Sequence, residues 1–268
     1  MIVDGRAIAE ELYQALAERR KKFGVVKLGI VIVGANPVIE SFVRIKTRAA
    51  QSLNIEIVRV DLPAEAATEF VVSEVKKLTD ITDALIVQLP LPGGVDTNTV
   101  LSAIPPEKDV DALNPAIPED SHPVFAPVAL AVVELLQRSR VRIDAARTVV
   151  VGAGRLVGTP SAVLLKRLGA KVTLFTLQQG SVADLKDADI VVCGAGNPGF
   201  IKPEHVKLGV VIIDAGASES KGKVVGDADP ACATKASVFT PVPGGVGPVA
   251  VAMIFKNLFD LLEKFSRP

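Results

Sequence analysis

The chain has 268 residues, of which 49% are hydrophobic and 22% are charged. This apolar content excludes an intrinsically disordered protein, and two cysteines in so long a chain exclude a scaffold held by disulfides. Thirty Lys and Arg residues balance thirty Asp and Glu residues, so no excess of positive charge indicates a nucleic-acid or anionic-membrane partner.

In the first half of the chain, short β-branched runs alternate with longer stretches whose apolar residues recur at helical spacing. Helices are predicted at 8–20, 41–53 and 69–78, and strands at 28–33, 56–62 and 84–87. Strands that alternate with helices of this length are typical of βαβ units, whose strands form a mostly parallel sheet.

A second series of the same kind begins near Arg147, after a proline-rich stretch at 105–127. Its predicted strands are 148–151, 171–175, 190–192, 210–213 and 238–239, with helices at 159–168 and 249–265. We therefore predict an α/β fold of two domains, each a mostly parallel sheet flanked by helices, the second of them Rossmann-like. The expected division is 1–138 plus 249–268 for the first domain and 139–248 for the second.

The cellular context follows from what the sequence lacks. No apolar run reaches the roughly 18 residues of a membrane span, and residues 1–6 lack the pattern of a signal peptide. Two cysteines suit a reducing compartment. We expect a cytoplasmic globular enzyme that binds neither nucleic acid nor a membrane.

The strongest local motif is a glycine-rich turn between a predicted strand and a predicted helix, with glycines at 152, 154 and 158. Such glycines let the backbone approach a pyrophosphate at the helix N-terminus, although any tight strand-to-helix turn can require them. The strand before the turn and the helix after it favour a dinucleotide site. The second strand ends at 175–179 without an acid for the ribose, and Arg155 either meets a 2′-phosphate or lies in solvent.

Polar side chains follow two strands of the first series. Lys46 lies one helical turn after Phe42, on a helix that follows the first strand, and Gln88 follows the third strand. Ligands collect at the carboxyl edge of open α/β sheets, although a solvated lysine and a strand-end glutamine without a role are the commoner cases.

Two further segments are candidates for ligand contact. Asp109 and Asp111 alternate in the run 108–111, so both face one way if it is extended, and a buried carboxylate there accepts hydrogen bonds from a heterocycle. Three prolines and three glycines stiffen and shape the loop 241–248. Both segments also suit ordinary loops. His122 and His205 stand without metal-ligand spacing, and we expect no metal site.

Four motifs occur in an order that resembles the methylenetetrahydrofolate dehydrogenase/cyclohydrolase family. They are Val-Gln-Leu-Pro-Leu-Pro at 87–92, Pro-Glu-Lys-Asp-Val-Asp at 106–111, Val-Gly-x-Pro at 157–160 and Pro-Val-Pro-Gly-Gly-Val-Gly-Pro at 241–248. The resemblance implies a homodimer, a folate-binding catalytic domain, a Rossmann-type cofactor domain and a folate cleft between the two. It implies oxidation of 5,10-methylenetetrahydrofolate by NADP, and hydrolysis of the methenyl product to 10-formyltetrahydrofolate.

The resemblance also implies roles for single residues. Lys46 matches the essential lysine of the hydrolytic step, Gln88 the residue that tunes it, and Asp111 the acid that holds the pterin. The implied substrate-binding residues are Phe42, Gln88, Leu89, Pro90, Asp111, Pro243, Gly244 and Gly245. The implied cofactor-binding residues are Gly152, Gly154, Arg155, Leu156, Val157, Gly158, Gly194 and Gly247.

The sequence departs from the family pattern at several of these sites. Phe42 stands in place of Tyr, and Ala112 in place of Gly. Ala153 and Gly154 replace Arg-Ser, and Thr and Leu at 176–177 replace His-Ser, groups that usually recognise the 2′-phosphate of NADP. Further departures lie at Ile39 and 124–127.

We predict from these departures a dehydrogenase whose hydrolytic activity is weakened, which uses NADP and for which NAD is possible. The alternatives are a homodimeric folate-binding protein that has diverged from the family, and an NAD(P)-dependent oxidoreductase of the same fold that acts on another small substrate.

Overall fold

The computed structural model describes residues 1–34, 36–176, 180, 182–220 and 223–265. The chain forms two compact units. The first unit consists of Leu12–Pro127 and the chain from Ile254, and the second consists of Met1–Glu11 and Val128–Met253. The boundaries of these compact units differ from the expected domain boundaries. Which segments bind folate and which bind the dinucleotide stays a prediction.

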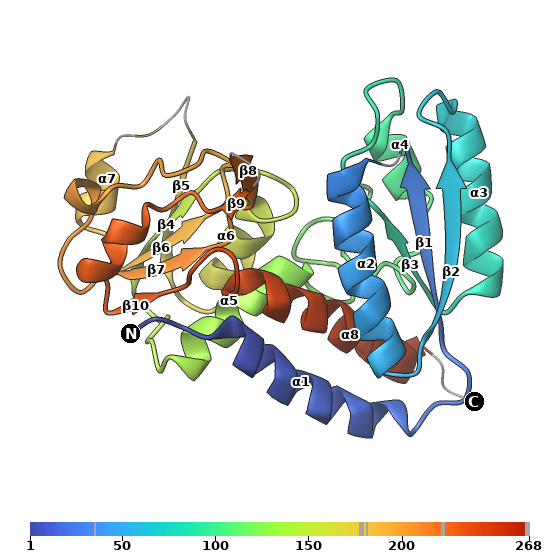
Figure 1. Cartoon of the computed structure of the whole chain (residues 1–268), viewed down its shortest axis with the longest axis horizontal. Helices are drawn as coiled ribbons and strands as arrows, with labels where there is room; N and C mark the ends of the chain where they lie inside the picture. Colours follow the sequence, from blue (N-terminus) through green and yellow to red (C-terminus); the bar gives the residue numbers. More distant parts are fainter. Residues whose placement is uncertain (35, 177–179, 181, 221–222, 266–268) are drawn as a thin grey trace. The chain divides into compact units, whose positions relative to one another are not determined.

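The first unit contains a parallel sheet of three strands in the order β2-β1-β3 (Figure 1). The strands are β1 (Lys27–Val33), β2 (Glu56–Leu62) and β3 (Ala84–Val87), joined through α2 (Pro37–Ser52) and α3 (Thr68–Ile81). Residues 28–33 and all of β3 are buried, as their continuous apolar runs predict.

Helix α2 begins four residues before its predicted start at 41, because a cap is built into the turn. The Asn36 side chain accepts hydrogen bonds from the backbone N–H groups of Val38 and Ile39, both at 3.0 Å. Pro37 occupies the first helical turn, where its missing N–H costs nothing. The helix N-terminus thus lies at Asn36 and Pro37.

The second unit contains a parallel sheet of five strands in the order β10-β7-β6-β4-β5. The strands are β4 (Arg147–Val151), β5 (Lys171–Phe175), β6 (Ile190–Cys193), β7 (Val211–Asp214) and β10 (Val238–Phe239). Helices α6 (Gly158–Arg167) and α7 (Ala183–Lys186) lie between strands. The two parallel sheets confirm the predicted fold class.

Three longer helices and several short elements complete the chain. The helices are α1 (Gly5–Arg20), α5 (Pro127–Arg138) and α8 (Val246–Phe265). The short elements are α4 (Thr97–Ser102), the antiparallel pair β8 (Ser218–Ser220) and β9 (Lys223–Val225), and 3₁₀ turns at Pro203–His205 and Pro230–Thr234. Helix α4 was not predicted, because six residues are too few for a periodic signal. Within the described ranges, no helix is both long and apolar enough to cross a membrane.

Each sheet has a point where the chain reverses its direction of travel across the strands. In the first sheet the chain moves from β1 to β2 on one side and then to β3 on the other; in the second it moves from β4 to β5 and then to β6. Loops diverge at the carboxyl ends of such strands, and open α/β folds bind ligands there. The topology therefore predicts ligand sites at the carboxyl ends of β1 and β3 in the first sheet, and of β4 and β6 in the second.

Asn257 on α8 fixes the loop that follows the first sheet. Its side chain is fully buried, and its Nδ2 donates to the carbonyl oxygens of Val110 and Phe125, each at 2.8 Å. One amide group thus bonds to two backbone acceptors, one buried and one partly buried.

We expect Asn257→Ala to lower the free energy of unfolding by about 2–5 kcal/mol, because it removes the donor to one buried and one partly buried carbonyl oxygen. The measurement is denaturant unfolding followed by circular dichroism. The matched control is Lys256→Ala on the same helix, which removes a partly exposed ion pair with Asp260 and should cost less than about 1 kcal/mol. Equal losses of unfolding free energy in the two variants would contradict the role given to the Asn257 amide.

Candidate active site

Lys46 and Gln88 meet at the carboxyl edge of the first sheet, as the sequence predicts. The Lys46 Nζ donates to Oε1 of Gln88 at 2.9 Å, and the Gln88 Nε2 donates to the Leu89 carbonyl oxygen at 2.8 Å. The Gln88 backbone N–H donates to the carbonyl oxygen of Val31 on β1. The amide is buried and held at both ends, so its oxygen is fixed toward the lysine.

Asp111 acts electrostatically on the same lysine. Burial of the ammonium lowers the pKa of Lys46, and the negative charge of Asp111 opposes that shift. Burial likewise raises the pKa of Asp111, and the charge of Lys46 opposes it. A lysine that gives up its proton more readily than usual is better able to act as a base or proton carrier.

The other predicted substrate-binding residues of the first unit lie close in sequence to Lys46 or to Gln88. Phe42, one turn before Lys46 on α2, is 42% exposed and leaves its ring available for stacking on a flat ligand. Leu89 is half-buried and Pro90 exposed, and the peptide bond between them is cis.

The run 108–111 is not extended, which corrects the expectation that both acids face one way. It consists of turns around Asp109, which forms a single bridge with Leu85. Asp109 is 1% exposed, and its Oδ2 accepts hydrogen bonds from the N–H groups of Leu113 and Asn114 at 2.8 and 2.9 Å. Burial, helped by the charge of Asp111, raises the pKa of Asp109 to about 7.

In the second unit, the glycine-rich turn lies at the end of β4. Gly152 has a φ of +99°, and a Cβ on Gly158 would lie 1.8 Å from the Gly152 carbonyl oxygen. Only glycine at 158 therefore lets α6 approach the strand. Residues 153–156, which include Arg155 and Leu156, are exposed, and Val157 is half-buried.

Asp227 holds the neighbouring loop after β6, a role that its sequence context does not signal. Its Oδ2 accepts the N–H groups of Ala195 and Gly196 at 2.7 and 3.1 Å, directly after the predicted cofactor residue Gly194. Asp227 is fully buried, and burial raises its pKa. Its backbone N–H in turn donates to Asp214, whose pKa burial raises to about 6.

The proline–glycine loop is shorter than the sequence predicts. Its Val242–Pro243 peptide bond is cis, Gly244 has a φ of +106°, and the Gly245 N–H donates to the Pro241 carbonyl oxygen at 2.8 Å. Helix α8 begins at Val246 and not at 249, so Gly247 lies in its first turn. The strand-end positions 177–179, which were considered for ribose recognition, lie outside the described residues.

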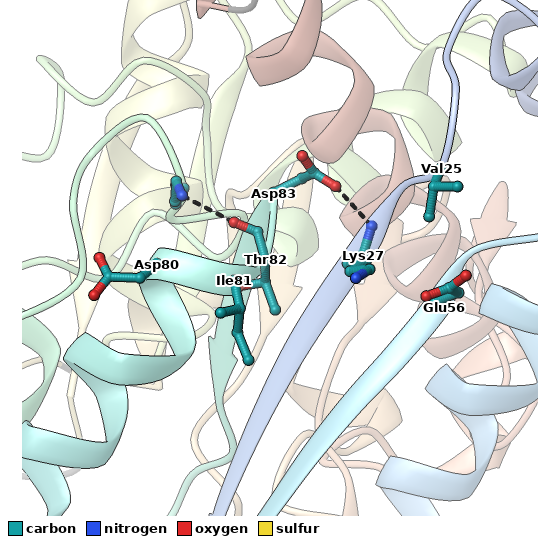
Figure 2. Close-up of a pocket in the computed structure, with 8 residues that line it drawn as sticks. Val25, Lys27, Glu56, Asp80, Ile81, Thr82 and Asp83 are labelled. Atoms are coloured by element: carbon teal, nitrogen blue, oxygen red, sulfur yellow. Dashed lines mark hydrogen bonds between the residues drawn. The ribbon is translucent and has the colours of Figure 1, made fainter.

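A surface hollow lies at the opposite edge of the first sheet (Figure 2). It is lined by Val25, Lys27, Glu56, Asp80, Ile81, Thr82, Asp83 and Lys108. Lys27 and Glu56 begin β1 and β2, and Asp83 precedes β3, so the hollow marks the amino ends of the strands. None of the predicted site residues lines it. Across the described part of the chain, no group of three or more His, Cys, Asp or Glu side chains is placed to hold a metal ion.

The fold and these clusters define a class: a two-unit α/β protein with a polar side-chain cluster at one sheet edge and a dinucleotide-type turn at another. Residues 3–111 match the catalytic domain of tetrahydrofolate dehydrogenase/cyclohydrolase, and residues 126–266 match its NAD(P)-binding domain. The chain therefore belongs to the tetrahydrofolate dehydrogenase/cyclohydrolase family, which confirms the resemblance that the motifs carry.

Three relatives illustrate the match. A bifunctional protein FolD from Methanoculleus marisnigri is 40% identical, covering 97% of this chain and 95% of that protein. The methylenetetrahydrofolate dehydrogenase-cyclohydrolase of Trypanosoma brucei, solved with NADP and an inhibitor, is 35% identical with a TM-score of 0.92, covering 100% of this chain and 99% of that one. The bifunctional enzyme of Campylobacter jejuni is 28% identical with a TM-score of 0.92, covering 98% and 99%.

Two glycines of the turn make a matched pair for testing its geometry. We expect Gly158→Ala to lower both thermal stability and NADP affinity, because the new methyl would overlap the Gly152 carbonyl oxygen. Gly154→Ala should keep the wild-type melting temperature, since no atom lies within 4 Å of a Cβ there. Melting curves and NADP titration by calorimetry measure both effects, and a Gly158→Ala protein as stable as wild type would contradict the packing.

Proposed function

We propose that this protein oxidises 5,10-methylenetetrahydrofolate to the 5,10-methenyl form with NADP as hydride acceptor, and hydrolyses the product slowly to 10-formyltetrahydrofolate. The observation that carries the proposal is the hydrogen bond from Lys46 to Gln88 beside Asp111, in a chain of this family. The folate-binding protein and the oxidoreductase with another substrate have no observation in their favour.

The second unit's residues fit a bound dinucleotide. The exposed loop 153–156 lies between β4 and α6, and a helix N-terminus preceded by such a loop attracts a pyrophosphate. Gly152, Gly154 and Gly158 would let the backbone approach the phosphates, with Gly194 at the neighbouring strand end. The nicotinamide, when bound, supplies the acceptor for the hydride.

The first unit's residues are suited to hold the folate and to move its proton. Asp111 offers carboxylate oxygens to the amino and ring N–H groups of a pterin, and Phe42 offers a face for stacking. Water that attacks the methenyl carbon must lose a proton, and Lys46 is the group with a lowered pKa that can receive it. Gln88 orients the lysine and cannot itself titrate.

Recognition of the 2′-phosphate rests on few groups in this chain. Ala153 and Gly154 carry no charge, so Arg155 is the cation of the glycine-rich turn that can meet a phosphate. We infer a preference for NADP that is weaker than is usual in the family.

We further infer that the protein works as a homodimer in the cytoplasm. The family resemblance supports the dimer. The buried and unpaired thiols of Cys193 and Cys232 support a reducing compartment. Light scattering of the purified protein measures the oligomeric state.

The first test is reduction of each dinucleotide with 5,10-methylenetetrahydrofolate, followed by absorbance. We expect activity with both, and a lower ratio of kcat/KM for NADP over NAD in Arg155→Ala, by about tenfold, because a charged contact is worth about 1.5–3 kcal/mol. No reduction of either dinucleotide would refute the proposed activity. A ratio unchanged in Arg155→Ala would refute only the role of the arginine.

The second test concerns hydrolysis of methenyltetrahydrofolate, measured as the decay of its absorbance in a buffer that suppresses spontaneous opening. We expect Phe42→Tyr to raise the rate by up to about 10²-fold, because it supplies a positioned hydroxyl beside the lysine. Lys46→Met should reduce the rate to the spontaneous one. A fast wild-type rate that Phe42→Tyr leaves unchanged would show that this hydroxyl is dispensable.

A further inference from the structure

The turn that presents Asp111 contains an unfavourable backbone conformation. Ala112, directly after Asp111, has a φ of +52°, in the left-handed region that side-chain-bearing residues rarely adopt. Some other interaction must therefore hold the turn in this shape, since Ala at this position favours a different one.

The Asp109 carboxyl closes this turn across Ala112. Its Oδ2 accepts the N–H groups of Leu113 and Asn114 at 2.8 and 2.9 Å, and its carbonyl oxygen accepts the Ala112 N–H at 3.3 Å. These bonds span the residue in the left-handed region, so a single side chain fixes the direction in which Asp111 leaves the turn.

The rest of the segment is anchored by other side chains, which do not bond across Ala112 as Asp109 does. The Lys108 Nζ donates to the carbonyl oxygens of Thr79 and Thr82. Asn257 donates to the Val110 carbonyl oxygen. These bonds hold the backbone before Asp111. After it, the Asn114 Nδ2 donates to the Ile104 carbonyl oxygen at 2.8 Å and Asn257 also donates to Phe125, so Asp109 is the side chain whose bonds close directly over Ala112.

The second oxygen of Asp109 is not explained by the turn. Oδ1 is buried and has no hydrogen-bond partner. A buried ionisable group with an unpartnered oxygen is costly, and an asparagine could accept the same two N–H bonds without carrying a charge. The carboxyl therefore does something that its hydrogen bonds alone do not require.

We propose that Asp109 is a positioning residue for the reaction: its carboxyl holds Asp111 opposite Lys46, and its charge sets how readily Asp111 ionises there. The inference rests on the proposed function of Lys46 and Asp111. Asp109 would thus be a titratable group that acts on the reaction through Asp111, without itself contacting folate or dinucleotide.

The electrostatic coupling has a defined sign. Burial and the charge of Asp111 raise the pKa of Asp109 to about 7, and by reciprocity a charged Asp109 disfavours a charged Asp111. Asp109 pairs through its backbone with Leu85 of β3, and the next residue, Val110, is bonded to Asn257 of α8; both of these neighbours are uncharged. The Lys108 ammonium donates to the carbonyl oxygens of Thr79, on α3, and of Thr82, directly after α3.

The test measures the pKa of Lys46 directly, by the pH dependence of its acylation followed by peptide mass spectrometry, and needs no catalytic activity. Asp109→Asn keeps an acceptor for the two N–H groups and removes the charge, so Asp111 ionises more readily and the pKa of Lys46 should rise. Asp109→Ala releases the turn, so Asp111 leaves the lysine and the pKa of Lys46 should fall. A merely structural role predicts no such opposite shifts.

Kinetics supply a second readout on the same variants. Asp109→Ala should raise the KM for methylenetetrahydrofolate by about tenfold or more with little change in NADP affinity, and adding Ala112→Gly should recover part of it, because glycine adopts the left-handed conformation freely. Asp109→Asn should keep the KM and lose the ionisation near pH 7 in the pH–rate profile of hydrolysis.

The matched control is Asp83→Asn, at the amino end of the same sheet, where a carboxylate oxygen likewise accepts one backbone N–H, that of Lys27. It should match wild type in every readout. Unshifted Lys46 pKa values in both Asp109 variants would overturn the inference, as would equal losses of folate and NADP binding. A wild-type protein without dehydrogenase activity would refute the proposed function, and the Lys46 measurement would still decide the inference.

Discussion

The desolvated ammonium of Lys46 is the constraint around which the first unit is arranged. Removing a charge from water is costly unless partners compensate, and here a fixed amide oxygen of Gln88 and the charge of Asp111 provide the compensation. These residues come from α2, from the end of β3 and from a turn that follows α4, so no local segment could assemble them. Parallel pairing of β1 with β3 brings their supporting backbones together.

The two units share the same reversal of strand order but place different kinds of groups beside it. Each sheet reverses its strand order beside its first strand, and the candidate residues follow that strand and the one reached after the reversal. In the first unit side chains form the site, as recognition of a heterocycle requires. In the second, glycines remove side chains so that the backbone itself can approach a phosphate. Side-chain departures from the family therefore alter the chemistry of the first unit more directly than they alter the dinucleotide fold.

Buried carboxylates recur as supports for loops rather than as surface ion pairs. Asp109 holds the turn that presents Asp111, Asp227 holds the loop after β6, and Asp214 holds the loop after β7. Each accepts several backbone N–H groups, which is how a loop without regular structure satisfies its polar atoms away from water. Under the proposed function, such rigid loops hold the ligands in position, while the loss of a hydroxyl at Phe42 affects only the proton transfer.

The sequence by itself determined the strands of the two parallel sheets, the fold class and the family, because apolar periodicity and the proline–glycine motifs are local signals; it did not signal the short pair β8 and β9. It also placed Lys46 and Gln88 at one sheet edge, since both follow strands of one parallel series. Only the tertiary structure decided that their side chains form a hydrogen bond, that α2 begins at Pro37, and that 108–111 turns with Asp109 inward. Those outcomes depend on caps, burial and hydrogen bonds between residues far apart in the chain, which local propensity does not encode.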